Sequence, residues 1–288
     1  MAEPVPHSLT PPEALTLRVD SLDTQQGIGG GDLDNEANRT AESILGAHMP
    51  AYDHYVGAAR DFVADKLGMT DVSSVDRTAV LPAETAEAWG VGSSGGHYLP
   101  ELEVAYVFEQ SSGRPKTDKL ILASSLVHEL AHSATVTPEN ARSENPFYHE
   151  ALAGMAEYFA LQNLAEAGEF DPAPDTTVTR TVGGEDITIV VPGSFRRVDA
   201  SEVKDGQADS TQALIAAMVV GMGLKINGQS AKELLGLARR GDNAAYDAMR
   251  NAMASIDPTL VEDILQTSGS TDEIIKVAHK AQKIVEMI

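Results

Sequence analysis

The chain has 288 residues, of which 42% are hydrophobic and 22% are charged, a composition that excludes collagen-like, coiled-coil and fully disordered proteins. Its 43 acidic and 21 basic residues give a net charge of −22, so we expect neither nucleic acid nor an anionic membrane surface as a partner. Because cysteine is absent, His, Asp and Glu remain as the strong metal ligands.

Residues 1–35 are rich in Pro, Gly, Asp and Gln without a sustained hydrophobic period, which predicts a flexible N-terminal tail. The first residues lack the basic start and apolar core of a secretory signal, so we expect a cytoplasmic protein, with a secreted chain that has lost its signal as the alternative. The longest apolar run, Ala213 to Leu224, is 12 residues, short of the ~20 that cross a bilayer. We therefore expect no membrane insertion.

The remaining sequence predicts an α+β fold, with a catalytic region at 36–205 and a helical C-terminal lobe at 206–288. Apolar spacing indicates two helices between Asn35 and Met69, broken near Pro50, and two strands at Thr78–Leu81 and Val104–Phe108. The next predicted elements are helices over 119–136 and 146–167, a hairpin over 176–191 around two glycines, and five helices over 210–224, 230–239, 243–254, 258–266 and 271–288.

The segment from Leu126 to Ser133 contains the motif H-E-x-x-H, as His128, Glu129 and His132, inside a pattern that is already helical. Residues four apart share one helix face, so both imidazoles can bind one Zn²⁺. Glu129 then lies next to the ion without binding it, placed to accept a proton from water. The apolar residues around the motif predict a buried helix, and buried titratable groups need partners, which favours the metal hypothesis over a pair of surface histidines.

A catalytic zinc needs a third protein ligand and keeps a fourth position for water. The extended metzincin pattern is excluded, because Thr135 occupies its glycine position and Pro138 its third histidine position.

The HELAH motif and the downstream helical segment HEALAGMAEYFA, residues 149–160, together resemble the gluzincin class of zinc metallopeptidases. The resemblance implies a zincin-like domain with an active-site helix, a glutamate helix, a small sheet and a helical lobe, in which Val104–Phe108 is the sheet edge that lines the cleft. It also implies that Glu150 is the third ligand of one zinc ion per chain. Many thermolysin-like members have an acid that supports a ligand histidine where this chain has Gly154, which moves that role elsewhere, to Glu157 in our interpretation.

Other residues remain alternatives for these roles. Glu157 shares a helix face with Glu150 and is the main rival as third ligand, followed by Glu144, His149 and Asp171. The donor that would stabilise charge on the substrate oxygen is open. The candidates for that donor are Tyr148, His149, Tyr158, Arg196, Arg197 and Tyr246. His97 is interpreted as an ordinary loop histidine.

The expected function is zinc-dependent hydrolysis of a peptide or protein substrate, with Glu129 as general base and acid. No G-x-M-x-N motif of the kind that aminopeptidase-like families carry stands upstream, so endopeptidase action is preferred. The alternative is a catalytically weak zincin-like domain that serves as a binding or structural module.

Overall fold

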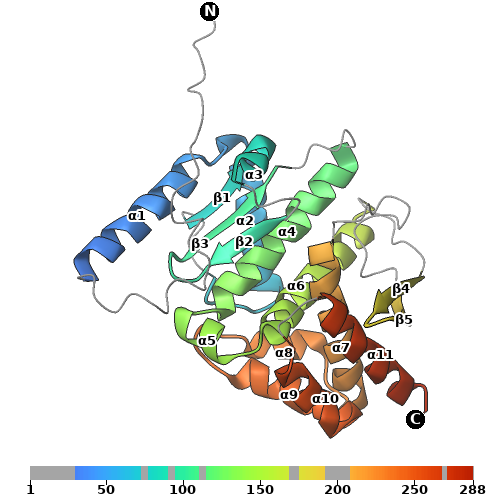
Figure 1. Cartoon of the computed structure of the whole chain (residues 1–288). Coiled ribbons are helices and arrows are strands. Elements are labelled where there is room, and N and C mark those ends of the chain that lie inside the picture. The colour runs from blue at the N-terminus through green and yellow to red at the C-terminus, as the bar shows by residue number, and fades with distance from the viewer. Residues whose placement is uncertain are drawn as a thin grey trace, which may run out of the picture.

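A computed structural model describes residues 30–72, 77–89, 95–109, 115–168, 175–191, 208–267 and 271–287. Helices make up most of these residues and the strands form two small sheets, so the predicted α+β class is confirmed (Figure 1). Most of the predicted tail, residues 1–29, lies outside the described part of the chain, and its last residues belong to a helix that begins at Gly30.

The larger sheet has three strands in the order β1, β3, β2. β3 (Val104–Phe108) is central, pairing in parallel with β1 (Thr78–Leu81) and antiparallel with β2 (Gly96–Leu99). All five β3 residues are buried, as expected for a strand with a neighbour on each side. The prediction that Val104–Phe108 is the sheet edge is therefore wrong. The outer strands are β1 and β2. The glycine-rich start of β2 is typical of a turn, and pairing with β3 makes this segment a strand.

Helices cover both faces of this sheet, and alternate strand residues divide between two hydrophobic clusters. α1 (Gly30–Gly46) contributes Ala41 and Ile44 to the smaller cluster, with Tyr106 of β3. α4 (Pro115–Thr135) lies on the opposite face, where Val107 joins the main core. The other elements of this half are the 3₁₀ turn Pro50–Tyr52, α2 (Asp53–Asp61), the π-helical turn Phe62–Lys66 and α3 (Ala83–Trp89).

The two outer strands of this sheet have different surroundings. On β1, the N–H of Val80 donates to Nδ1 of His48 at 2.9 Å, and the N–H of Met49 donates to the Val80 carbonyl oxygen at 2.9 Å. This part of the β1 edge is therefore capped by the chain itself. β2 instead lies along α4, where Gly96 faces the side chain of Glu129.

α6 (Pro146–Glu166) is the central helix of the other half and packs between α4 and α7 (Ala208–Ile226). It follows α4 through the short α5 (Pro138–Ser143). Glycines allow close helix contacts on both sides of α7. A Cβ at Gly154 would lie 3.2 Å from the Ala217 Cβ and clash with the Ala213 carbonyl, and one at Gly223 would clash with the Ala252 carbonyl of α9 (Ala244–Ile256).

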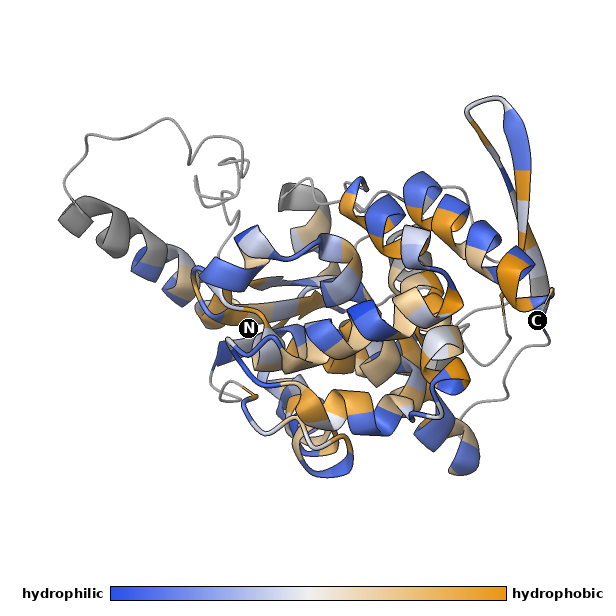
Figure 2. Cartoon of the chain, turned by 90° about the horizontal axis from the view of Figure 1, so that it is seen from below, coloured by the Kyte–Doolittle hydropathy of each residue, from blue (hydrophilic) through white to orange (hydrophobic). Residues whose placement is uncertain are grey.

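The predicted hairpin is confirmed as β4 (Thr176–Val182) and β5 (Glu185–Val191). Its turn residues Gly183 and Gly184 both have positive φ, 63° and 88°, which explains why glycine is required there. Hydrophobic and hydrophilic residues alternate along the hairpin (Figure 2), and its apolar face packs on α11 (Thr271–Val285). Gln282 of α11 donates to the Val190 carbonyl oxygen at 2.6 Å and accepts from the Val190 N–H at 3.1 Å.

The five predicted C-terminal helices are present, including α8 (Ala231–Leu237) and α10 (Pro258–Leu265). They share one hydrophobic core with α4 and α6, and the division into regions at residue 206 stays a prediction. Among the described residues, no helix combines the length and apolar character needed to span a bilayer.

The contact at Gly223 gives a test of the α7–α9 packing. We expect Gly223→Ala to lower the free energy of unfolding by about 1–3 kcal/mol, because the added methyl group meets backbone that has to move. Gly221→Ala, in the same helix with no atom within 4 Å of the added Cβ, should instead leave stability unchanged or raise it by about 0.5–1 kcal/mol. Urea unfolding followed by circular dichroism measures both, and equal effects would contradict this account of the packing.

Candidate metal centre

α4 and α6 bring together three of the predicted site residues. Nε2 of His128 lies 3.1 Å from Nε2 of His132 and 3.4 Å from Oε2 of Glu150, and Nε2 of His132 lies 3.5 Å from Oε1 of Glu150. One ligand atom from each residue lies within 4.8 Å of the others, so the group could hold a metal ion.

The donor set and its spacing fit a small divalent cation. Ligand atoms bound at 2.0–2.1 Å in a tetrahedral site lie about 3.3 Å from one another, which is close to the observed separations. The two histidine side chains are 14% and 11% exposed and that of Glu150 is 29% exposed, so the group is largely shielded but not fully closed off from solvent.

Glu157, the alternative third ligand, is not a member of the metal-binding group and lies instead on the other side of the His128 ring. Its Oε2 lies 3.3 Å from Nδ1 of His128, the ring nitrogen opposite the one that faces Glu150, and its side chain is 0% exposed. A carboxylate at this position orients the imidazole and raises its basicity as a ligand. At Gly154, one turn earlier in α6, the contact with α7 leaves no room for an acidic side chain.

Two of the candidate ligands, His128 and Glu150, have shifted pKa values. Burial opposes the charged form of His128, but hydrogen bonds to the Glu150 and Glu157 carboxylates outweigh it and raise the pKa of His128 well above its ordinary value. Burial also opposes ionisation of Glu150, but hydrogen bonds from His128 and His132 outweigh it and hold the pKa of Glu150 well below its ordinary value. The ion-free group is therefore held together by hydrogen bonds between imidazole and carboxylate.

Glu129 lies on α4 between the two histidines in sequence, but it is not a member of the three-residue group. It is 6% exposed, and its Cγ would lie only 3.0 Å from a Cβ built on Gly96 of β2. The absence of a side chain at Gly96 thus lets the edge strand approach the helix at Glu129.

The structure places the other candidate ligands and candidate donors outside the metal-binding group or does not describe them. His149 hydrogen-bonds to Tyr246, with Nδ1 2.8 Å from Oη, and Glu144 forms an ion pair with Arg250 at 2.6 Å. Tyr158 accepts a hydrogen bond from Gln162 at 2.6 Å. His97, interpreted as a loop residue, is an exposed residue of β2. Asp171, Arg196 and Arg197 lie outside the described residues.

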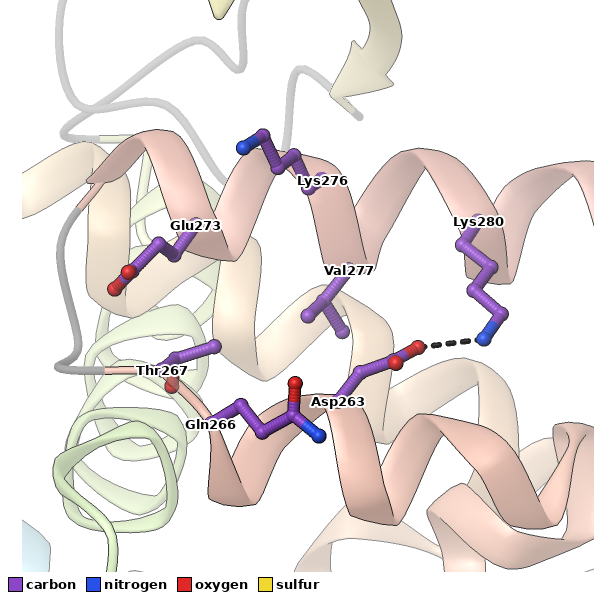
Figure 3. A pocket seen from close by; sticks show the side chains of 7 residues that line it. All are labelled: Asp263, Gln266, Thr267, Glu273, Lys276, Val277 and Lys280. Carbon is purple, nitrogen blue, oxygen red and sulfur yellow. Dashed lines mark hydrogen bonds and ion pairs between the residues drawn. The ribbon is translucent and has the colours of Figure 1, made fainter. Parts of the chain in front are cut away.

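A pocket of about 360 Å³ lies between α10 and α11, and no residue that lines it belongs to the metal-binding group (Figure 3). Two of its charges neutralise each other, since Nζ of Lys280 lies 2.5 Å from Oδ2 of Asp263. The other two charged lining residues, Glu273 and Lys276, also have opposite signs, and the candidate ligands lie elsewhere, so the pocket plays no part in the candidate site.

The chain matches no family model, no curated protein and no solved structure. The resemblance to gluzincins therefore depends on the residues and geometry described above, and membership of that class stays a prediction.

The raised pKa of His128 predicts that metal affinity depends on pH. A metal ion must displace the proton that the ion-free His128 holds, so affinity should increase with pH, by about tenfold per unit while one proton is released. Zinc titrations at three pH values between 6 and 8, each in two buffers with different ionisation enthalpies, measure affinity and proton release together. Affinity that does not change with pH would contradict the assignment of His128 as a ligand.

Removing the charge of Glu157 should weaken metal binding without abolishing it. We expect Glu157→Gln to lower zinc affinity about 10–100-fold, the range for groups that support a ligand histidine. Glu150→Gln removes a direct ligand in our assignment and should cost more. Competition against a chromophoric chelator gives both affinities. A greater loss of affinity in Glu157→Gln than in Glu150→Gln would indicate that Glu157 is the direct ligand and Glu150 the supporting residue.

Proposed function

We propose that the protein is a zinc-dependent endopeptidase of the gluzincin type. The observation that carries this proposal is the meeting of His128, His132 and Glu150 at the spacing of ligands to one ion, with Glu129 on the same helix as the two histidines. Two imidazole nitrogens and one carboxylate form a known ligand set of catalytic zinc, which leaves a coordination position for water.

A zinc ion held by these residues would supply Lewis-acid chemistry, polarising a carbonyl group and making water acidic enough to lose a proton near neutral pH. Glu129 would accept that proton as general base. The water oxygen would bond to the carbonyl carbon and the C–N bond would break, with the proton on Glu129 passing to the departing amine. Burial of Glu129 against β2 supports this role, because it holds the carboxylate in a fixed position.

The edge strand supports a peptide as the substrate. The N–H of Phe108 donates to the carbonyl oxygen of Gly95 at 3.2 Å, and the antiparallel alternation then directs the backbone groups of Tyr98 away from β3. An extended peptide can add to such an edge through main-chain hydrogen bonds. Because Gly96 of the same strand faces Glu129, a peptide bound there would pass close to the general base.

The role of Glu129 can be separated from metal binding. In zinc-loaded protein assayed with a fluorogenic peptide library, Glu129→Gln should lower kcat by about 10²–10⁴-fold, because the variant cannot accept the proton. Its zinc content should stay at that of the wild type, since Glu129 lies outside the ligand group. Mass spectrometry of the purified protein gives the metal content.

Glu139→Gln is the matched control, because this exposed glutamate follows the same helix and its replacement changes the net charge equally. It should hydrolyse peptides at the wild-type rate. Equal hydrolysis by Glu129→Gln and the wild type would overturn the catalytic assignment. A wild type that binds zinc but cleaves no member of the library would favour the alternative, a zincin-like binding or structural module.

A further inference from the structure

The first turn of α6, just before Glu150, is attached to the C-terminal helices by partly buried polar contacts. Asn145, which caps α6, donates from Nδ2 to the carbonyl oxygens of Ile264 at 2.9 Å and Thr267 at 3.0 Å. Arg250 of α9 reaches the preceding residue, Glu144, at 2.6 Å. These contacts attach the start of the glutamate helix to α9 and to the end of α10.

His149 makes the contact nearest to the metal-binding group, because it directly precedes Glu150. Its Nδ1 lies 2.8 Å from Oη of Tyr246 on α9, and its Nε2 lies 3.3 Å from the carbonyl oxygen of Asn140. A carbonyl oxygen can only accept, so Nε2 carries the hydrogen and Nδ1 is the acceptor. The Tyr246 hydroxyl therefore donates to His149.

The other ring nitrogen of His149 leads to the end of the histidine helix. Its partner Asn140 lies in α5, next to the end of α4, where the Thr135 hydroxyl donates from Oγ1 to the Ala131 carbonyl oxygen at 3.0 Å. Nδ2 of Asn140 donates to the Thr135 carbonyl oxygen at 2.8 Å, which closes the network between α4, α5 and α6. Thr135 is the last residue of α4, one turn beyond His132.

We propose that Tyr246 is a positioning residue of the metal centre. Its hydroxyl fixes the ring of His149, the residue before Glu150, and the other nitrogen of that ring bonds through Asn140 to the end of the helix that carries His128 and His132. Tyr246 thereby sets the distance between the two sets of ligands. The inference deepens the proposed function and rests on it, because it requires that the three residues bind a metal ion.

The hydroxyl and the ring of Tyr246 can be tested separately. The ring is 1% exposed and packs edge-on against His149, with centroids 5.2 Å apart, so a phenylalanine would keep this packing. The hydroxyl is the donor to Nδ1 of His149, and its loss would leave this buried nitrogen without that donor.

The test compares Tyr246→Phe with Tyr148→Phe. Tyr148 is an ideal control because it is also 1% exposed, lies two residues before Glu150, and has a buried hydroxyl with no hydrogen-bond partner among the described residues. Tyr246→Phe should lower affinity for Zn²⁺ and Co²⁺ by about tenfold and alter the visible absorption spectrum of bound Co²⁺. Tyr148→Phe should match the wild type in affinity, within about twofold, and in spectrum. Urea unfolding in excess chelator reports the stability of each ion-free protein.

Variants at His149 keep the inference testable if Tyr246→Phe does not fold. His149→Gln can still accept from Tyr246 and donate to Asn140, so it should retain most of the metal affinity, whereas His149→Leu should lose about tenfold. Adding Tyr246→Phe to His149→Leu should cause little further loss, because the two residues act through one hydrogen bond.

The outcomes separate the inference from the proposed function. A wild type that binds metal, together with a folded Tyr246→Phe of equal affinity and identical Co²⁺ spectrum, would overturn the inference and leave the proposed function in place. Equal losses in Tyr246→Phe and Tyr148→Phe would also overturn it, since they would trace the effect to general packing. A wild type that binds neither Zn²⁺ nor Co²⁺ would overturn the proposed function and the inference with it.

Discussion

The close packing of α6 between α4 and α7 is the constraint on which the candidate site depends. His128 and His132 can meet Glu150 only because α4 and α6 lie side by side, and α7 packs closely on α6 at Gly154. The sequence of α6 is accordingly apolar around most of its circumference, which is the pattern of a helix buried on all sides. The two charged groups it carries inside the protein, Glu150 and Glu157, both contact His128.

Packing alone does not place a side chain to within a few tenths of an ångström, and the polar contacts around α6 supply the rest. Glu157 holds the far side of the His128 ring, while Asn145 and His149 attach the start of the helix to α9 and α10. Polar groups buried in this way are costly unless each finds its partner, so such a network has few alternative arrangements. The C-terminal helices are thus part of the structure that shapes the site, although none of them contributes a candidate ligand.

The parts of this site that could be predicted are those set by local spacing. Four-residue spacing places His128 and His132 on one face, and the resemblance pointed to Glu150, which the structure brings to the same point. The choice between Glu150 and Glu157 needed the packing of α4 on α6, because both residues share a face. The link from Tyr246 to His149 spans 97 residues, and no local pattern indicates it. The edge position of β2 was missed for a similar reason, since pairing with β3 makes its glycine-rich segment a strand.

The contact between Gln282 and Val190 forms late, because the two residues lie far apart in the sequence. A glutamine amide offers one donor and one acceptor, as a peptide group does, so Gln282 takes the place of a further strand at the β5 edge. The ribosome has to add another 92 residues after Val190 before this amide exists. During that interval the edge of the new hairpin bonds to water and is open to pairing with other chains. The edge closes when α11 folds onto the hairpin, so docking of this last helix ends the period in which the edge is exposed to this kind of misassembly.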